Sequence, residues 1–275
     1  MYPIKRRRVL ALFGAVFFTL GLALIMIQER LIFFPEQISE QYTFKFKNFD
    51  EIFFDFEGQK MNSLLFPEDS SDIVLLYLHG NAGSLVGWGD VASKLRDELS
   101  VGVWIVDYPG YGKSEGSIQS ERQLLAFTEH FLSVARKAFP QKNFVMYGRS
   151  IGSGPAAWVA AKYKLPLILE TPYASFSKLA SEHAPWFPSF LKRYTFETLK
   201  WLKNYKQPLL LIHGNQDEVI PVEHSHLLKE ALPKSNFKEI VGGTHNNLSD
   251  FKDYWSSLRV FVNKLTPVDL RELSL

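Results

Sequence analysis

Residues 143–158 read NFVMYGRSIGSGPAAW, and Gly-Arg-Ser-Ile-Gly interrupts this stretch near its middle. An apolar run precedes Ser150, and a row of small residues follows it. Glycine and serine are also common in ordinary turns, because they tolerate or stabilise unusual backbone angles. Whether Ser150 has a chemical role therefore depends on what the rest of the chain places around it.

Similar short apolar runs recur along the chain, and each is short enough for a strand buried on both faces. They read DIVLLYLHG (72–80), VGVWIVDY (101–108), NFVMYGRS (143–150), LPLILE (165–170) and QPLLLIHG (207–214). Segments with helical spacing lie between most of them, such as 121–139, where Ser120 and Gln123 can form a capping box. Strands that alternate with helices predict an α/β fold with a mainly parallel central sheet.

The region before these runs has a different pattern. Residues 42–49, YTFKFKNF, alternate polar and apolar side chains, which predicts a half-buried strand. EIFFDF (51–56) and KMNSLLF (60–66) predict two more strands, joined by a hairpin turn around Gly58 and Gln59. We therefore expect antiparallel strands along one edge of the sheet.

Residues 9–27 form an uninterrupted run without charge, amide or proline. As a helix this run would rise roughly 29 Å, close to the ~30 Å hydrocarbon thickness of a bilayer. A cleaved signal peptide usually has a shorter apolar region that ends in a small-residue cleavage site, whereas this run ends in Ile-Met-Ile-Gln-Glu. The run therefore predicts an uncleaved transmembrane anchor.

The charges on the two sides of this run predict its orientation. Lys5, Arg6, Arg7 and Arg8 precede it, and Arg30 follows it. The positive-inside rule then places the N-terminus in the cytoplasm. The remaining chain would lie on the far side of the membrane, in the periplasm if the protein is bacterial.

Composition excludes several classes of function. Lys and Arg total 31 against 29 Asp and Glu, a formal net charge of +2, so no basic field favours nucleic acid as a partner. The chain has no cysteine, which excludes disulfides, thiolate catalysis and zinc sites with sulfur ligands. An apolar fraction of 46% indicates a substantial buried core.

Ser150 lies where reactive groups gather in such sheets, at the carboxyl end of a strand. It directly precedes an expected helix that carries Pro155 in its first turn. In a Gly-x-Ser-x-Gly elbow the serine sits on a strained turn, and Gly148 and Gly152 leave room for the neighbouring strand and helix. An isolated motif of this kind also occurs in ordinary turns, so a nucleophilic Ser150 requires partners.

A serine nucleophile needs a base, and the base needs an acid that fixes its tautomer. Asp217 follows the strand expected at 207–214, and His245 follows a final apolar segment. The chain order is Ser, Asp, His, with each residue after a strand of one sheet. This pattern predicts a catalytic triad of Ser150, Asp217 and His245, with the adjacent Glu218 as the alternative acid.

Other polar residues in the motifs have structural interpretations. Asp107 and Glu170 also end strands, and no histidine follows Asp107 closely, which favours turn-forming roles. His213 is interpreted as a packed residue at a strand end. His224 and His226 are two residues apart on an expected helix and face different directions, so they make a poor metal pair.

An oxyanion hole would complete the site. One donor is expected to be the backbone N–H of Ile151, the residue after the nucleophile. The second would come from the loop HGNAGS (79–84), through the N–H of Asn81 or Ala82.

The motifs LYLHGNAGS, VDYPGYGKSEG, YGRSIGSGPA, LILETPYASF, HGNQDEVIPVEHS and GGTHNN together resemble the α/β-hydrolase superfamily. More narrowly, they are similar to N-terminally anchored serine hydrolases of the bud-emergence type and to the α/β-hydrolase-domain-containing proteins. The resemblance covers about 51–265. It implies a triad of Ser150, Asp217 and His245 and no metal or organic cofactor, and the family also contains thioesterases that remove acyl groups from proteins.

These interpretations divide the chain into segments with different expected roles. We expect a basic cytoplasmic tail (1–8), a transmembrane anchor (9–27), a linker with the first strand (28–50), an α/β-hydrolase domain (51–265) and a C-terminal tail (266–275). A small helical cap is expected at 173–205, where Phe176, Trp186, Phe187, Phe190, Tyr194, Phe196 and Trp201 raise the aromatic density.

The sequence thus predicts a membrane-anchored serine hydrolase of carboxylic esters or thioesters. Aromatic walls in the cap favour an apolar acyl group. Two alternatives remain at this point: a serine peptidase of the same fold, and a catalytically silent relative that binds a partner or lipid.

Overall fold

The structure, a computed structural model, describes residues 19, 21 and 24–265. Its strands are β1 (Phe34–Pro35), β2 (Asp50–Phe56), β3 (Gln59–Phe66), β4 (Ile73–Leu78), β5 (Ala82–Gly83), β6 (Gly102–Val106), β7 (Asn143–Arg149), β8 (Leu167–Glu170), β9 (Leu209–Gly214) and β10 (Asn236–Ile240). Every apolar run that predicted a buried strand forms one, because such runs can pack on both faces of a sheet.

These strands form one large sheet and one small one. The large sheet has the order β10-β9-β8-β7-β4-β6-β3-β2, and β1 pairs with β5 separately. Neighbours from β10 to β6 are parallel, whereas β3 pairs antiparallel with both β6 and β2. The β2–β3 hairpin turns at Glu57 and Gly58, whose φ angles are 55° and 77°. The predicted parallel sheet with an antiparallel edge is therefore confirmed.

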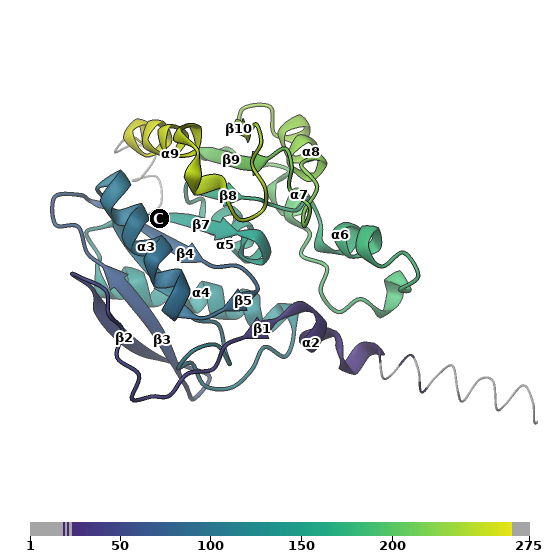
Figure 1. The fold of residues 1–275 in the computed structure, drawn as a ribbon, viewed down its shortest axis with the longest axis horizontal. Helices are drawn as coiled ribbons and strands as arrows, with labels where there is room; N and C mark the ends of the chain where they lie inside the picture. The colour runs from purple at the N-terminus through teal and green to yellow at the C-terminus, as the bar shows by residue number, and fades with distance from the viewer. Residues whose placement is uncertain (1–18, 20, 22–23, 266–275) are drawn as a thin grey trace, which may run out of the picture.

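Helices cover both faces of the large sheet (Figure 1). They are α2 (Gln28–Ile32), α3 (Leu85–Leu99), α4 (Glu121–Ala138), α5 (Ser153–Tyr163), α6 (Phe176–His183), α7 (Thr198–Leu202), α8 (Glu223–Ala231) and α9 (Lys252–Lys264), with short 3-10 helices at η1 (Ser150–Gly152), η2 (Ser189–Leu191) and η3 (Leu248–Asp250). α3 and α9 pack on one face, and α4, α5 and α8 pack on the other.

The alternation of side chains along the strands builds these two cores. In β4, Val74, Leu76 and Leu78 point to the face covered by α4 and α5, whereas Leu75 and Tyr77 point to the face covered by α3 and α9. Successive residues of a strand point to opposite sides, so a strand with no polar position is buried on both.

The expected helix at 121–139 is confirmed as α4. The Oγ atom of Ser120 accepts a hydrogen bond from the Gln123 N–H at 3.1 Å, which caps the first turn. The Gln123 side chain reaches back to the Gln119 N–H at 2.8 Å, one residue before the cap.

Residues 42–49 do not form the predicted strand. Phe44 is buried, and the ring of Phe46 lies so close to Gly89 of α3 that a Cβ on Gly89 would collide with it. Phe46 also meets Phe66 of β3, with ring centroids 5.7 Å apart. The alternation therefore reflects rings buried on one side of an irregular segment, and burial alone does not require a neighbouring strand.

Most of the predicted anchor, 9–27, lies outside the described residues, as do the predicted tails 1–8 and 266–275. Among the residues that are described, none of the helices combines the length and the apolar character needed to cross a membrane.

The predicted cap at 173–205 contains α6, η2 and α7. Figure 1 shows α6 standing away from the sheet on the side where α2 lies. Helix α2 follows the expected anchor, and Gln28 of α2 contacts Leu191 and Arg193 of the cap. The two segments are thus neighbours in space, although they are far apart in the sequence.

Candidate active site

The turn between β7 and α5 holds Ser150 in an unusual backbone conformation. Its φ is 52°, in the left-handed region that a residue other than glycine rarely adopts. A Cβ on Gly148 would lie 2.7 Å from Ala156 Cβ, and a Cβ on Gly152 would collide with the Leu78 carbonyl oxygen. Glycine at both positions lets the strand and the helix approach closely, which is what allows the sharp turn.

The structure brings Ser150, His245 and Asp217 together from three separate strand ends. His245 Nε2 lies 3.1 Å from Ser150 Oγ, and His245 Nδ1 lies 2.8 Å from Asp217 Oδ2. All three residues are buried, with Ser150 8% exposed. A hydroxyl, an imidazole and a carboxylate in this sequence of contacts can move a proton from the hydroxyl to the imidazole.

Asp217 is held by hydrogen bonds on both carboxylate oxygens. Its Oδ1 accepts the backbone N–H groups of Val219 and Ile220 at 2.9 and 2.8 Å. Burial raises the pKa of this carboxyl, but hydrogen bonds from His213, His245 and the Ile220 backbone outweigh burial and hold the pKa well below its usual range. Asp217 therefore carries a negative charge at neutral pH, next to the imidazole that it orients.

The alternative acid, Glu218, is exposed, whereas the Asp217 carboxylate is the group in contact with His245. Although Glu218 is adjacent to Asp217 in the sequence, its side chain thus lies in solvent and not against His245. Of the two carboxylates considered from the sequence, the structure places Asp217 in the cluster.

His213 has a contact that the sequence interpretation missed. It is fully buried, as a packed strand-end residue would be, but its Nε2 also donates to Asp217 Oδ2 at 3.1 Å and to the Ile220 carbonyl at 2.8 Å. Both neighbours of Nε2 are acceptors, so this nitrogen carries a proton. Nδ1 lies 2.7 Å from Ser225 Oγ. His213 therefore positions Asp217. The sequence signal that could have indicated this contact is the spacing, because His213 lies only four residues before Asp217.

Glu170 does not form a turn as predicted; it belongs to a buried network below the elbow. Its Oε2 accepts hydrogen bonds from Tyr147 and Tyr254 at 2.6 and 2.9 Å, and its Oε1 lies 3.0 Å from Arg149 Nε. The Nη2 atom of Arg149 donates to the His245 carbonyl at 2.9 Å. Arg149 thus joins β7 to the loop that carries His245.

We expect Arg149→Met to lower the free energy of unfolding by about 3–5 kcal/mol, because it leaves the buried Glu170 carboxylate without its cation. Adding Glu170→Gln to this variant should recover part of the loss, since the amide can still bond to the tyrosines. Urea unfolding measures both effects. As a control, Lys162→Met breaks the more exposed pair with Glu129 and should cost less than about 1 kcal/mol. Equal losses for the two single variants would contradict the assigned role of the buried pair.

Asp107 supports the loop expected to supply the second oxyanion donor. It is fully buried, accepts the Leu85 N–H at 3.2 Å and lies 3.4 Å from His79 Nε2. Burial raises the pKa of Asp107, while the His79 contact opposes the increase. The prediction of a turn-forming residue therefore captured its place at a strand end but missed the contact with His79, which begins that loop.

Asn81 and Ile151 line the same cavity as Ser150. The Asn81 side chain donates to the Ile32 carbonyl at 3.0 Å, and its backbone carbonyl accepts from Tyr111 OH at 2.7 Å. These bonds fix the position of Asn81 beside the elbow, where a second N–H was expected.

His224 and His226 contact different partners on different sides of α8. His224 Nε2 lies 2.9 Å from Glu182, and His226 Nε2 lies 2.8 Å from Glu239. The two imidazoles therefore do not come together in the structure. This agrees with the prediction, from their spacing on the helix, that they face different directions.

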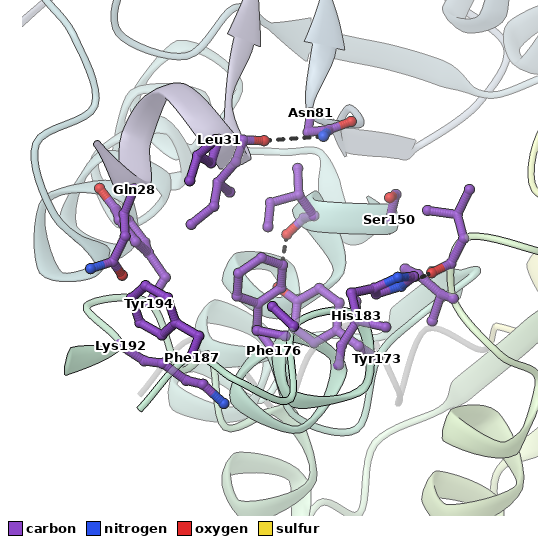
Figure 2. A pocket seen from close by; sticks show the side chains of 17 residues that line it. Gln28, Leu31, Asn81, Ser150, Tyr173, Phe176, His183, Phe187, Lys192 and Tyr194 are labelled. Atoms are coloured by element: carbon purple, nitrogen blue, oxygen red, sulfur yellow. Dashed lines mark hydrogen bonds between the residues drawn. The ribbon is translucent and has the colours of Figure 1, made fainter. Parts of the chain in front are cut away.

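A cavity of about 320 Å³ opens beside Ser150, and Figure 2 shows its lining. Of the seven cap aromatics singled out from the sequence, Phe176, Phe187 and Tyr194 line it. Phe196 is buried, whereas Trp186 and Phe190 are 69% and 79% exposed. The cavity is largely apolar, although Lys192 also lines it and donates from Nζ to the Ser177 carbonyl at 2.8 Å.

Comparison with known proteins shows which family the chain resembles. A sequence profile of the alpha/beta hydrolase fold matches residues 73–195. Alpha/beta hydrolase domain-containing protein 17C of Mus musculus is 29% identical over 205 residues, which cover 72% of this chain and 62% of that protein. The chain belongs to the α/β-hydrolase superfamily. It spans less than two thirds of the length of the mouse relative.

Other relatives and solved structures agree with this α/β-hydrolase fold. Alpha/beta hydrolase domain-containing protein 17B of Homo sapiens is 30% identical over 197 residues, covering 69% of this chain and 66% of that protein. An esterase of Pyrococcus furiosus superposes with a TM-score of 0.64 at 19% identity, over 84% of this α/β hydrolase and 98% of that chain. Est1E of Butyrivibrio proteoclasticus, solved with ferulic acid, gives 0.63 at 20% identity, over 78% and 98%. At such identities the two structures show the fold alone.

Proposed function

We propose that this α/β hydrolase is a membrane-anchored serine esterase or thioesterase that prefers apolar acyl groups. The observation that carries the proposal is the chain of contacts from Ser150 through His245 to Asp217 at the end of an apolar cavity. A peptidase would share the triad, but the largely apolar lining favours a hydrocarbon group over a charged peptide.

In the proposed reaction each residue takes a role that its contacts support. Ser150 Oγ attacks the acyl carbon while His245 Nε2 accepts the hydroxyl proton, and Asp217 stabilises the imidazolium that forms. The N–H groups of Ile151 and Asn81 would stabilise the oxyanion. His245 then returns the proton to the leaving alcohol or thiol. Water, activated by the same imidazole, releases the acid from the acyl-enzyme.

The anchor in this proposal rests on the uncharged run at 9–27 and the basic cluster before it. The N-terminus would be cytoplasmic and the hydrolase domain on the far side, in the periplasm of a bacterium. A reporter that is active only outside the cytoplasm, fused after Leu275, tests this topology. A signal from a cytoplasm-only reporter at the same position would overturn it.

A chain-length series of nitrophenyl esters tests the substrate preference. We expect kcat/KM to rise from acetate towards longer chains, because each methylene buried in the cavity contributes up to about 0.8 kcal/mol, or about fourfold. A maximum at acetate with a steady fall for longer chains would contradict the preference. Faster cleavage of charged peptides than of any ester would support the peptidase alternative, and a protein that cleaves neither would support the silent binding relative.

A further inference from the structure

Helix α2 forms part of the wall of the cavity beside Ser150. Gln28, Leu31 and Ile32 line the cavity together with the residues of the cap. Figure 2 shows Gln28 and Tyr194 at the opposite end of the cavity from Ser150. An acyl group attached to Ser150 would therefore extend towards α2 as its chain becomes longer.

Gln28 attaches α2 to the backbone of the cap. Its Nε2 donates to the Leu191 carbonyl at 2.9 Å, and its Oε1 accepts the Arg193 N–H at 2.9 Å. The side chain is buried, with the residue 6% exposed. One amide thus satisfies a donor and an acceptor of the cap, which neither a carboxylate nor a hydrocarbon side chain can do.

Glu29 adds a second attachment beside Gln28. Its Oε1 accepts a hydrogen bond from Tyr194 OH at 2.9 Å and lies 2.6 Å from Arg193 Nη1. Tyr194 itself lines the cavity, so the same contact fixes both α2 and one of the cavity walls.

We propose that α2 is a specificity element of the hydrolase and acts as the second half of the cap. Gln28 holds α2 against the cap, and Leu31 provides apolar surface for acyl chains that extend beyond the first few carbons. Leu31 is 60% exposed although it lines the cavity, so a long chain that covers it removes apolar surface from water. We expect short acetyl groups to be much less sensitive to Gln28 and Leu31, because Gln28 lies at the opposite end of the cavity from Ser150 (Figure 2). This inference rests on the proposed function, in which Ser150 carries the acyl group.

Two variants of the full chain test the inference, each with a matched control. Leu31→Ala shortens the apolar wall, and Leu227→Ala changes an exposed leucine of α8 that does not line the cavity. Gln28→Glu places a carboxylate against the Leu191 carbonyl, and Gln37→Glu makes the same change of charge at an exposed position.

The measurement is kcat/KM for nitrophenyl acetate and nitrophenyl octanoate. We expect Leu31→Ala and Gln28→Glu to lower the octanoate value by roughly 5- to 10-fold, mainly through KM, while acetate changes less than about twofold. The control variants should match the wild type on both esters. An unchanged octanoate value in both test variants, or an equal loss on acetate, would overturn the role of α2. Urea midpoints identify any variant that fails to fold. If Gln28→Glu fails to fold, the esters are compared for Leu31→Ala alone, and that comparison decides whether α2 has the proposed role.

A separate measurement keeps this inference distinct from the proposed function. If the wild type cleaves neither ester, the proposed function fails, and calorimetric titration with octanoate still compares the variants. Weaker octanoate binding by Leu31→Ala and Gln28→Glu, with the controls unchanged, would support a specificity role for α2. Equal binding by all variants would refute it.

Discussion

Ester turnover is expected to fall by roughly 10⁴-fold or more when Ser150 is replaced by alanine, because loss of a triad nucleophile typically has this effect. The hydroxyl lies 3.1 Å from His245 Nε2, and alanine cannot supply the atom that attacks the acyl carbon. The fold should survive, since Gly148 and Gly152 still allow the tight turn. Initial rates on a nitrophenyl ester and urea midpoints measure the two effects.

Ser153→Ala is the matched control, because Ser153 is buried in the same turn region at the start of α5. It should retain activity within a few-fold of the wild type. A fluorophosphonate probe should label the wild type at Ser150 and leave Ser150→Ala unlabelled. Substantial turnover by Ser150→Ala, or a label at Ser114 or Ser153, would refute the assignment of the nucleophile.

Asp217→Asn is expected to reduce kcat by roughly 10⁴-fold while leaving the fold intact. Two backbone N–H groups face Oδ1, so the new amide must turn its NH₂ towards His245 and His213. His245 can then bond only by accepting at Nδ1, which leaves the proton on Nε2. In that tautomer the imidazole cannot accept the proton of Ser150.

The neighbouring substitution Glu218→Gln should change kcat by less than about twofold, because Glu218 is exposed. Comparable losses in the two variants would contradict the assignment of Asp217.

The pH dependence of the stability provides a second readout for Asp217. The lowered pKa of Asp217 means that its carboxylate stabilises the wild type above the ordinary aspartate pKa and loses this contribution as the pH falls. The urea midpoints of the wild type and Asp217→Asn should therefore begin to approach each other only as the pH falls below about 4.

The sheet could be predicted from the sequence because buried parallel strands are nearly continuous apolar runs, and the residue after each run marks the reactive edge. Ser150, Asp217 and His245 were found by this rule, and they converge in the structure. The irregular segment 42–49 could not be predicted, because its alternation reports which side chains are buried and says nothing of the partner that buries them.

The supporting contacts depend on residues that are far apart in the chain. Arg149 meets the His245 carbonyl across 96 positions, and Gln28 meets Arg193 across 165. No local pattern distinguishes such residues from ordinary polar ones, since their partners are chosen by the packing of the whole domain. The contact between His213 and Asp217 joins residues that are close in the sequence. It still could not be predicted, because it depends on the path of the loop between them.

The strand order distributes the three catalytic candidates unevenly over the sheet. β7, which carries Ser150 at its end, lies between β4 and β8, whereas β10, which leads to His245, is an edge strand that pairs with β9. Edge elements open in local fluctuations at lower free energy than the centre of a sheet. We then expect heating or mild denaturant to separate His245 from an elbow that is still folded, so that the proposed esterase activity would be lost by partial opening before the core of the domain melts.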